Sequence, residues 1–212
     1  MSSSSKQAKK LAVFASGYGS NLAAIIQYLD NHSINASLAL VFSDNPEAYA
    51  LERARKHNIK TCVMEPEDFK SRQDYDQNIA GVMETEQVDL IVLAGFMLLL
   101  SSWFVDRFKN RIMNIHPSLL PCFKGMHGIS DAFNYGVKIT GVTVHFVDGK
   151  LDHGPIILQK EVPVDQADTL SSLEEKVHKV EHKLYPEAIR FFCEDRLQIK
   201  ERKVIITGIE KE

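Results

Sequence analysis

The feature that most constrains the fold is a regular alternation of short apolar runs with longer amphipathic stretches. "LAVFAS" (11–16) and "SLALVFSD" (37–44) have the apolar character of buried strands. "SNLAAIIQYLDNH" between them places its apolar residues on one face of a helix. Strands separated by helices of this length predict right-handed βαβ units on a parallel sheet.

The alternation of predicted strands and helices continues along the chain and is followed by an antiparallel portion. "PEAYALERARKHN" predicts a helix with Pro46 in its first turn. Three further strands are predicted by "TCVMEP", "DLIVLAG" and "RIMNIH". A helix at "SRQDYDQNIAGVMETEQ" separates the first two of them, and a short helix near 101–108 separates the last two. "ITGVTVHFVD" alternates as an antiparallel strand does, with "PIILQKEVPV" as its partner. A long helix, bent or broken near Pro186, and the hairpin "LQIKERKVIIT" close the chain. The sequence therefore predicts a Rossmann-like α/β fold, with a mostly parallel twisted sheet, helices on both faces and an antiparallel C-terminal portion.

Composition narrows the class of protein. The length of 212 residues predicts one domain (11–212) after a flexible polar tail (1–10). A net charge of −3 provides no field for nucleic acid. Cys62, Cys122 and Cys193 lack CxxC spacing, which argues against disulfides and a zinc site. The longest apolar run, "LIVLAGFMLLL", is too short to span a bilayer. We therefore expect a cytoplasmic protein with no metal, no membrane and small-molecule partners, as a monomer or homodimer.

A glycine-rich turn follows the first predicted strand. In "SGYGSN" (16–21), Gly19 permits a tight turn, while Ser20 and Asn21 supply donors beside the free N–H groups of a helix N-terminus. This pattern favours a monophosphate site, and it lacks the Lys-Ser/Thr pair of a Walker A loop. A nicotinamide site remains open, because Asp44 ends the second strand where a ribose-binding acid would lie. A plain turn capped by Ser20 is the third interpretation.

"RIMNIHPSLLP" places two polar side chains at the end of a predicted strand. Because residues two apart in a strand face the same way, Asn114 and His116 project together. The Asn amide is a donor for a developing oxyanion, and the imidazole titrates near neutral pH. Pro117 and Pro121 restrict the loop that follows. A lone His beside a turn is more often structural than catalytic, so these two residues need a partner.

A candidate partner lies in "FVDGKLDHGPIILQ", between two predicted strands. A carboxylate in this loop would orient His116 and favour its charged form. Spacing alone leaves two candidates, Asp152 and Asp148, and aspartates are common in turns for purely local reasons.

At this point the motifs resemble a known family. "SGYGSNL", "LAGFM", "NIHPSLLP", "GVTVHFVDGKLDHGPIILQKEVPV" and "EHKLYP" together resemble the folate-dependent glycinamide ribonucleotide formyltransferases. The resemblance runs in unbroken order from about Leu11 to Leu197. It implies transfer of a formyl group from 10-formyltetrahydrofolate, as co-substrate, to the amine of 5′-phosphoribosylglycinamide in purine (IMP) biosynthesis.

The resemblance also implies roles for single residues. Asn114 and His116 match the family's catalytic Asn and His, with His116 as proton donor and charge stabiliser. Asp152 matches the acid that supports this His, so the resemblance favours Asp152 over Asp148. No metal is implied.

Substrate-binding positions follow in the same way. Gly19, Ser20 and Asn21 match the segment that holds the substrate phosphate and ribose. Glu181 matches a carboxylate that contacts the sugar nucleotide; without the resemblance we would expect an exposed helix residue.

Folate-binding positions come from two further stretches and the strand end. The matching residues are Arg72, Met97, Leu98, Leu99, Leu100 and Asn114. Without the resemblance, Arg72 reads as a solvated charge at a helix start and residues 97–100 read as a buried core run. Two departures are present: Leu98 stands where bacterial-type members usually carry Arg, and "GMHGISDAF" around His127 differs from the usual versions of the substrate-side loop.

Four other functions compete with this interpretation. 10-Formyltetrahydrofolate hydrolase resembles the same core, but usually has an N-terminal regulatory domain, and only about ten residues precede the first strand here. Methionyl-tRNA formyltransferase would need an extra C-terminal domain and a basic surface. A nicotinamide-dependent reductase would use the glycine loop and Asp44. A non-catalytic folate-binding protein is the fourth alternative.

Overall fold

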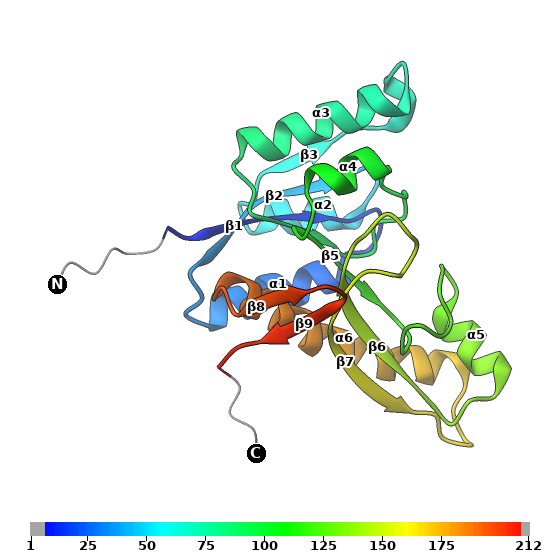
Figure 1. The fold of residues 1–212 in the computed structure, drawn as a ribbon. Coiled ribbons are helices and arrows are strands. Elements are labelled where there is room, and N and C mark those ends of the chain that lie inside the picture. Colours follow the sequence, from blue (N-terminus) through cyan, green and yellow to red (C-terminus); the bar gives the residue numbers. More distant parts are fainter. Residues whose placement is uncertain (1–6, 209–212) are drawn as a thin grey trace. The chain divides into compact units, whose positions relative to one another are not determined.

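The computed structural model describes residues 7–208, which fall into two compact units that divide between Leu100 and Ser101 (Figure 1). Each unit combines strands with helices, which confirms the predicted α/β class. In the first unit the elements are β1 (Lys9–Phe14), α1 (Ser20–Asn31), β2 (Ala36–Ser43), α2 (Tyr49–Lys56), β3 (Thr61–Val63), a 3₁₀ turn (Pro66–Asp68), α3 (Arg72–Thr85) and β4 (Leu90–Leu93).

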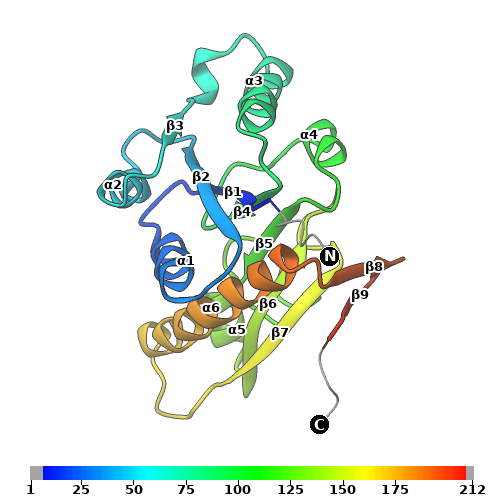
Figure 2. The ribbon, with the colours of Figure 1, turned by 90° about the vertical axis from the view of Figure 1, so that its left-hand side faces the viewer.

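The first unit has a parallel sheet. Its strands lie in the order β3-β2-β1-β4, and each neighbouring pair runs parallel. Helices α1 and α2 cover one face and α3 covers the other (Figure 2), as right-handed crossovers require when the strand order reverses at β1. The central strand is completely buried from Leu11 to Phe14, which is why "LAVF" is apolar on both faces rather than alternating.

The second unit is mainly antiparallel. Its elements are α4 (Ser102–Arg107), β5 (Ile112–His116), α5 (Gly128–Tyr135), β6 (Ile139–Phe146), β7 (Ile156–Pro163), α6 (Leu170–Cys193), β8 (Leu197–Lys200) and β9 (Lys203–Ile206). Strand β6 pairs antiparallel with β5 and with β7, and β8 and β9 form the predicted antiparallel hairpin. The hairpin joins the sheet through a parallel pairing of β9 with β7 at Ile156 and Lys203.

Helix α6 packs on strands β6 and β7 and orders this second unit. It begins at a capping box, in which Thr169 and Ser172 exchange side-chain and backbone hydrogen bonds of 3.0 and 3.2 Å. The hydroxyl of Tyr185 donates to the carbonyl of Met113 on β5 (2.9 Å). Of the two alternatives expected near Pro186, a bend or a break, the break is wrong, because α6 runs through this residue while its buried face stays packed on the sheet.

Three other local predictions need correction. Strand β1 begins at Lys9, so it includes the last two residues of the predicted tail; residues 1–6 lie outside the described chain. Helix α2 begins at Tyr49 rather than at Pro46, because the Asn45 side chain accepts the N–H of Glu47 (3.0 Å) and forms a turn there. "GISDAFNY" was expected as part of a loop but forms helix α5.

Candidate active site

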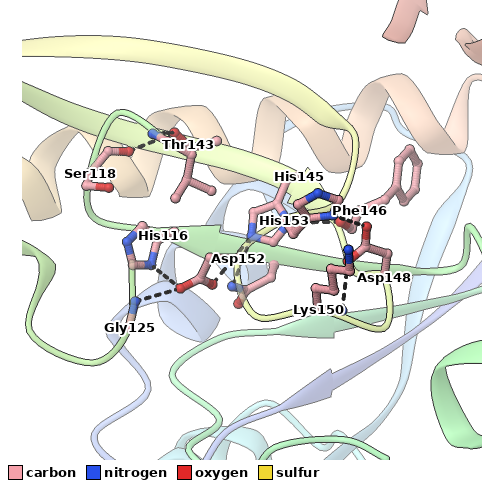
Figure 3. Close-up of polar contacts among 12 residues, drawn as sticks. His116, Ser118, Gly125, Thr143, His145, Phe146, Asp148, Lys150, Asp152 and His153 are labelled. Atoms are coloured by element: carbon pink, nitrogen blue, oxygen red, sulfur yellow. Dashed lines mark hydrogen bonds and ion pairs between the residues drawn. The ribbon is translucent and has the colours of Figure 1, made fainter. Parts of the chain in front are cut away.

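Asn114 and His116 project from the same face of β5, as the strand period predicts. The antiparallel register places His145 of β6 directly opposite Asn114 and Thr143 opposite His116. Four polar side chains therefore line one face of two adjacent strands in an otherwise apolar core (Figure 3).

The loop that carries Asp152 starts at the opposite end of the sheet from the carboxyl end of β5. Because β6 is antiparallel to β5, β6 ends beside the start of β5, where Val147 donates to the carbonyl of Ile112 (2.9 Å). The loop at residues 147–155 then folds back over the face that carries His116 and His145. Gly154 makes this path possible, since a Cβ there would lie 1.7 Å from the carbonyl oxygen of Phe146.

Asp152 and His116 form a buried pair. Asp152 Oδ2 lies 3.5 Å from His116 Nδ1, and the two side chains are 7% and 5% exposed (Figure 3). The same oxygen accepts the backbone N–H of Gly125 at 2.8 Å. Asp152 has a left-handed backbone conformation (φ 45°), which costs energy for a residue other than glycine and is maintained here by these contacts.

Both ring nitrogens of His116 face oxygen atoms. Nε2 donates to the carbonyl of Phe123 (2.7 Å), while Nδ1 faces Asp152. Nε2 therefore carries a hydrogen, because a carbonyl oxygen can only accept, and Nδ1 faces the carboxylate.

His145 is a site residue that the sequence analysis missed. Its Nδ1 faces the carbonyl of Phe146 (2.8 Å), so Nδ1 carries the hydrogen, and Nε2 is left to accept from the amide of Asn114 (3.3 Å). Burial lowers the pKa of His145, which keeps this neutral tautomer. The available signal was a His within the apolar strand "VTVHFV", facing a candidate catalytic Asn.

The loop after His116 is held by a buried hydrogen-bond network. The hydroxyl of Thr143 accepts from the N–H of Leu120 (3.0 Å) and from Gln159 Nε2 (2.9 Å), and it donates to the carbonyl of Ser118 (2.7 Å; Figure 3). Gln159 also donates to the carbonyl of Leu120 (2.9 Å). Strands β6 and β7 thus fix the "PSLLP" turn, in addition to the restriction that its prolines impose.

The competing carboxylate, Asp148, has a different partner. Its Oδ2 accepts from His153 Nδ1 at 2.7 Å, and its Oδ1 accepts the N–H of Lys150 at 3.0 Å. Geometry therefore separates the two aspartates that spacing could not: Asp152 faces His116, and Asp148 faces His153 (Figure 3).

Glu181 is buried, which overturns the expectation of an exposed helix residue. Its side chain is 6% exposed, on α6, and Oε2 accepts from His178 Nδ1 at 2.9 Å. The hydrogen bond to Glu181 raises the pKa of His178.

The glycine loop and the loop after β4 meet within the first unit. Ser16 N donates to the carbonyl of Gly95 (3.0 Å), and Met97 N donates to the hydroxyl of Ser16 (3.0 Å). That hydroxyl donates in turn to Asp44 (2.6 Å), so the suspected ribose-binding acid has a structural partner. Gly19 precedes α1 with φ 74°, and a Cβ there would lie 2.8 Å from the Cβ of Ala50, so the loop packs tightly on α2.

Arg72 and residues 97–100 also lie together. Arg72 Nε donates to the buried carboxylate of Asp76 (2.8 Å), and its guanidinium donates to the carbonyl of Leu99. The expected buried core run is wrong, because Met97 and Leu99 are 62% and 68% exposed. The first unit therefore presents apolar side chains on its surface beside an arginine.

Residues 7–208 contain neither a cluster of metal ligands nor a helix suited to crossing a membrane. Within this part of the chain, no three His, Cys, Asp or Glu side chains gather in a way that could hold a metal ion. No helix in it has the length and apolar character needed to cross a bilayer.

A buried carboxylate–imidazole pair beside an oriented amide, on an α/β fold, is suited to acyl transfer. Residues 9–189 match the family described as formyl transferase, and the chain belongs to this family.

Particular relatives narrow the comparison. The phosphoribosylglycinamide formyltransferase of Bacillus subtilis (strain 168) is 43% identical over 182 residues, which are 86% of this chain and 93% of that protein. The crystal structure of glycinamide ribonucleotide transformylase 1 from Symbiobacterium toebii matches with a TM-score of 0.91 and 43% identity over 95% of both chains. A formyltetrahydrofolate deformylase from Pseudomonas syringae pv. tomato str. DC3000 matches at 26% identity with a TM-score of 0.87, over 95% of this chain and 66% of that one. The predicted formyltransferase family is confirmed, and the hydrolase alternative has less support.

Proposed function

We propose that this protein transfers the formyl group of 10-formyltetrahydrofolate to the amine of 5′-phosphoribosylglycinamide, a step of purine biosynthesis. The observation that carries the proposal is the buried contact between Asp152 and His116, beside an amide whose orientation is fixed. The match of the chain to named phosphoribosylglycinamide formyltransferases supports the choice of acceptor.

The reaction needs a donor for a developing oxyanion. When the amine attacks the formyl carbon, the carbonyl oxygen gains negative charge. Asn114 is our candidate donor: one N–H of its amide is directed to His145, and the second N–H of the same group is directed by the same contact. An oriented donor of this kind stabilises a transition state by a factor of about 10²–10³ in rate.

The reaction also needs a proton at the leaving nitrogen. The amine loses one proton overall, and N10 of the folate gains one when its bond to the formyl carbon breaks. His116 is the proposed proton donor, and Asp152 stabilises the imidazolium and fixes the ring. Since Nε2 donates to the carbonyl of Phe123 in this structure, that hydrogen bond must be exchanged if Nε2 delivers the proton.

We assign the binding of the ribonucleotide to two segments. Gly19, Ser20 and Asn21 are the proposed phosphate and ribose segment, at the N-terminus of α1, where backbone N–H groups favour an anion. Glu181 is the proposed contact to the sugar, and its burial together with its hydrogen bond from His178 fits a carboxylate with a defined orientation.

We assign folate binding to the first unit and to Asn114. Arg72 and the residues Met97, Leu98, Leu99 and Leu100 are the proposed contacts. Exposed apolar side chains beside backbone polar groups suit a flat heterocycle, which needs its faces covered and its edge hydrogen-bonded. Because Leu98 is apolar, we expect no charged contact to the folate from this position.

The family match from residue 9 to 189 includes parts of both units, so we propose that residues 11–212 work as one formyltransferase domain. Small molecules are the proposed partners, and the cytoplasm is the proposed location.

The deciding experiment measures folate product from 10-formyltetrahydrofolate in the presence and absence of the ribonucleotide. We expect product only when the ribonucleotide is present, and at least about 100-fold slower formation of it by His116→Asn. Product that forms equally fast without the ribonucleotide would identify a hydrolase. A folded protein that gives no product under either condition would overturn the proposal.

A further inference from the structure

The C-terminal hairpin contacts the loop that carries Asp152. Arg202 lies in the turn between β8 and β9, and its neighbour Lys203 pairs with Ile156, the first residue of β7 after the loop. One guanidinium nitrogen, NH2, donates to the carbonyl of His153 (2.5 Å), and the other, NH1, lies 3.2 Å from His153 Nε2. Arg202 and His153, which are 49 positions apart in the sequence, therefore share two polar contacts.

The hydrogen between His153 and Asp148 is assigned by its acceptor. Asp148 has only acceptor oxygens when it is ionised, so His153 Nδ1 carries the hydrogen that binds it at 2.7 Å. Arg202 NH1 lies almost equally far from the two ring nitrogens, 3.2 Å from Nε2 and 3.3 Å from Nδ1, so the guanidinium contacts the imidazole ring as a whole. Although burial alone would raise it, the hydrogen bond from His153 lowers the pKa of Asp148, so its carboxylate stays charged. The imidazole of His153 thus lies between a carboxylate and a guanidinium.

These contacts join the two ends of the short segment from Asp148 to His153, in which Asp152 lies. The hydrogen bond between Asp148 and His153 joins the two ends of the segment, and Lys150 N–H binds Asp148 from within it. Asp152 directly precedes His153, whose carbonyl Arg202 holds. Because Asp152 has an unfavourable left-handed backbone (φ 45°), the segment needs contacts on both sides to keep this conformation. Gly125 binds the Asp152 side chain from one side, and the Arg202 contact holds the backbone from the other.

We propose that Arg202 is a positioning residue for the formyl transfer, and that Arg202, His153 and Asp148 form a loop clasp that holds Asp152 against His116. The inference rests on the proposed function. Arg202 lies beyond residues 9–189, the part of the chain that matches the family, whereas His153 and Asp148 lie within it.

The test compares Arg202→Gln with Glu201→Gln, a matched change in the same turn. We expect Arg202→Gln to lower kcat about tenfold, with KM for the ribonucleotide within about twofold, because Arg202 is not among the proposed ribonucleotide contacts and acts through Asp152. Arg202→Lys should recover part of the loss, since a lysine ammonium can still donate to the carbonyl of His153. Glu201→Gln should match the wild type.

A double-mutant cycle separates positioning of Asp152 from a general structural role. If Arg202 acts through Asp152, then Arg202→Gln should change kcat less than about twofold in an Asp152→Asn background. An unchanged kcat for Arg202→Gln, or a full tenfold loss in the Asp152→Asn background, would overturn the proposal. His153→Gln provides a second variant that removes the bridge and leaves the hairpin intact, in case Arg202→Gln does not fold.

A readout that does not depend on activity keeps the two proposals apart. The ring resonances of His116 in an NMR spectrum should move in Arg202→Gln toward their positions in Asp152→Asn, and should not move in Glu201→Gln. Inactive wild-type protein would reject the proposed function alone, whereas His116 resonances unchanged by Arg202→Gln would reject the loop clasp.

Discussion

Asp152 and Asp148 lie on one loop, and each faces a histidine, yet the two pairs differ in burial. The pair of Asp148 with His153 is the shorter, at 2.7 Å, and its side chains are 34% and 35% exposed. The pair of Asp152 with His116 is longer, at 3.5 Å, but its side chains are only 7% and 5% exposed. The pair with the shorter distance is therefore the pair with the more exposed side chains.

This difference shows that distance alone does not identify the chemically active pair. Exposed ion pairs contribute about 0–1 kcal/mol, because water screens them. A buried pair acts in a medium of lower effective dielectric constant, where charges stabilise a transition state more strongly. Burial therefore favours Asp152 over Asp148 as the partner of His116 in the proposed reaction, and we assign Asp148 to holding the loop in shape.

The largest expected effect is a difference in kcat between two variants, in each of which the carboxylate of one pair is neutralised. Asp152→Asn should lower kcat at least about 100-fold with the fold intact, as for a lost acid–base group, and His116→Asn should do the same. Asp148→Asn should cost about tenfold or less, because it weakens only the loop clasp. Steady-state kinetics at saturating substrates measure both values.

The outcome that contradicts this ranking is an active Asp152→Asn together with an inactive Asp148→Asn. Circular dichroism of both variants is the control, since a change in fold would lower kcat for an unrelated reason.

The second prediction concerns the path of the loop that carries both aspartates. Gly154→Ala would place a methyl group 1.7 Å from the carbonyl oxygen of Phe146, so the backbone must move. We expect the free energy of unfolding to fall by about 2 kcal/mol, the usual cost of forcing extra volume into a packed site. Gly149→Ala, on the same loop, has no atom within 4 Å of its added methyl group and should change stability by less than about 0.5 kcal/mol. Urea unfolding monitored by fluorescence tests both, and equal stabilities would contradict the close approach at Gly154.

Much of the fold could be predicted from the sequence because its signals are local. Apolar runs such as "LAVFAS" and the turn residues around them predicted the parallel strands, and the period of a strand predicted that Asn114 and His116 share a face. Helix α5 was missed because it is short (Gly128–Tyr135), begins at a glycine and has only a two-turn apolar face, so its position depends on contacts outside the segment.

The partner of His116 could not be predicted from spacing, because the choice between Asp148 and Asp152 depends on how the loop folds. That path is set by the antiparallel direction of β6, by Gly154 and by the left-handed backbone at Asp152. His145 was missed for a similar reason. Its role depends on the cross-strand register that places it opposite Asn114, and register is a property of two strands rather than of one.

The third prediction extends the comparison to the neutral His145 beside the buried pair. His145→Gln should lower kcat about tenfold while KM for the ribonucleotide stays nearly constant, because the change affects the orientation of the Asn114 amide rather than the proposed ribonucleotide contacts. The effect should vanish in an Asn114→Ala background, since the amide that His145 orients is then absent. An additive loss in the double variant would show that His145 acts elsewhere.

The smallest expected effect is a pH dependence of stability that differs in sign between two histidines. Burial lowers the pKa of His145 below its ordinary value of 6.5, so the unfolded chain binds a proton there more readily than the folded chain. The stability linked to neutral His145 is therefore complete above pH 6.5 and is lost as the pH falls below it. The slope cannot exceed about 1.4 kcal/mol per pH unit for one proton.

His178 provides the opposite case, because its hydrogen bond to Glu181 raises its pKa above 6.5. Its contribution is complete below pH 6.5 and is lost as the pH rises through the raised value. In urea unfolding between pH 5 and 8, His145→Gln should flatten the acidic side of the stability profile, and His178→Gln should flatten the basic side. If both variants changed the same side, then the buried neutral state assigned to His145, and with it the orientation of the Asn114 amide, would be wrong.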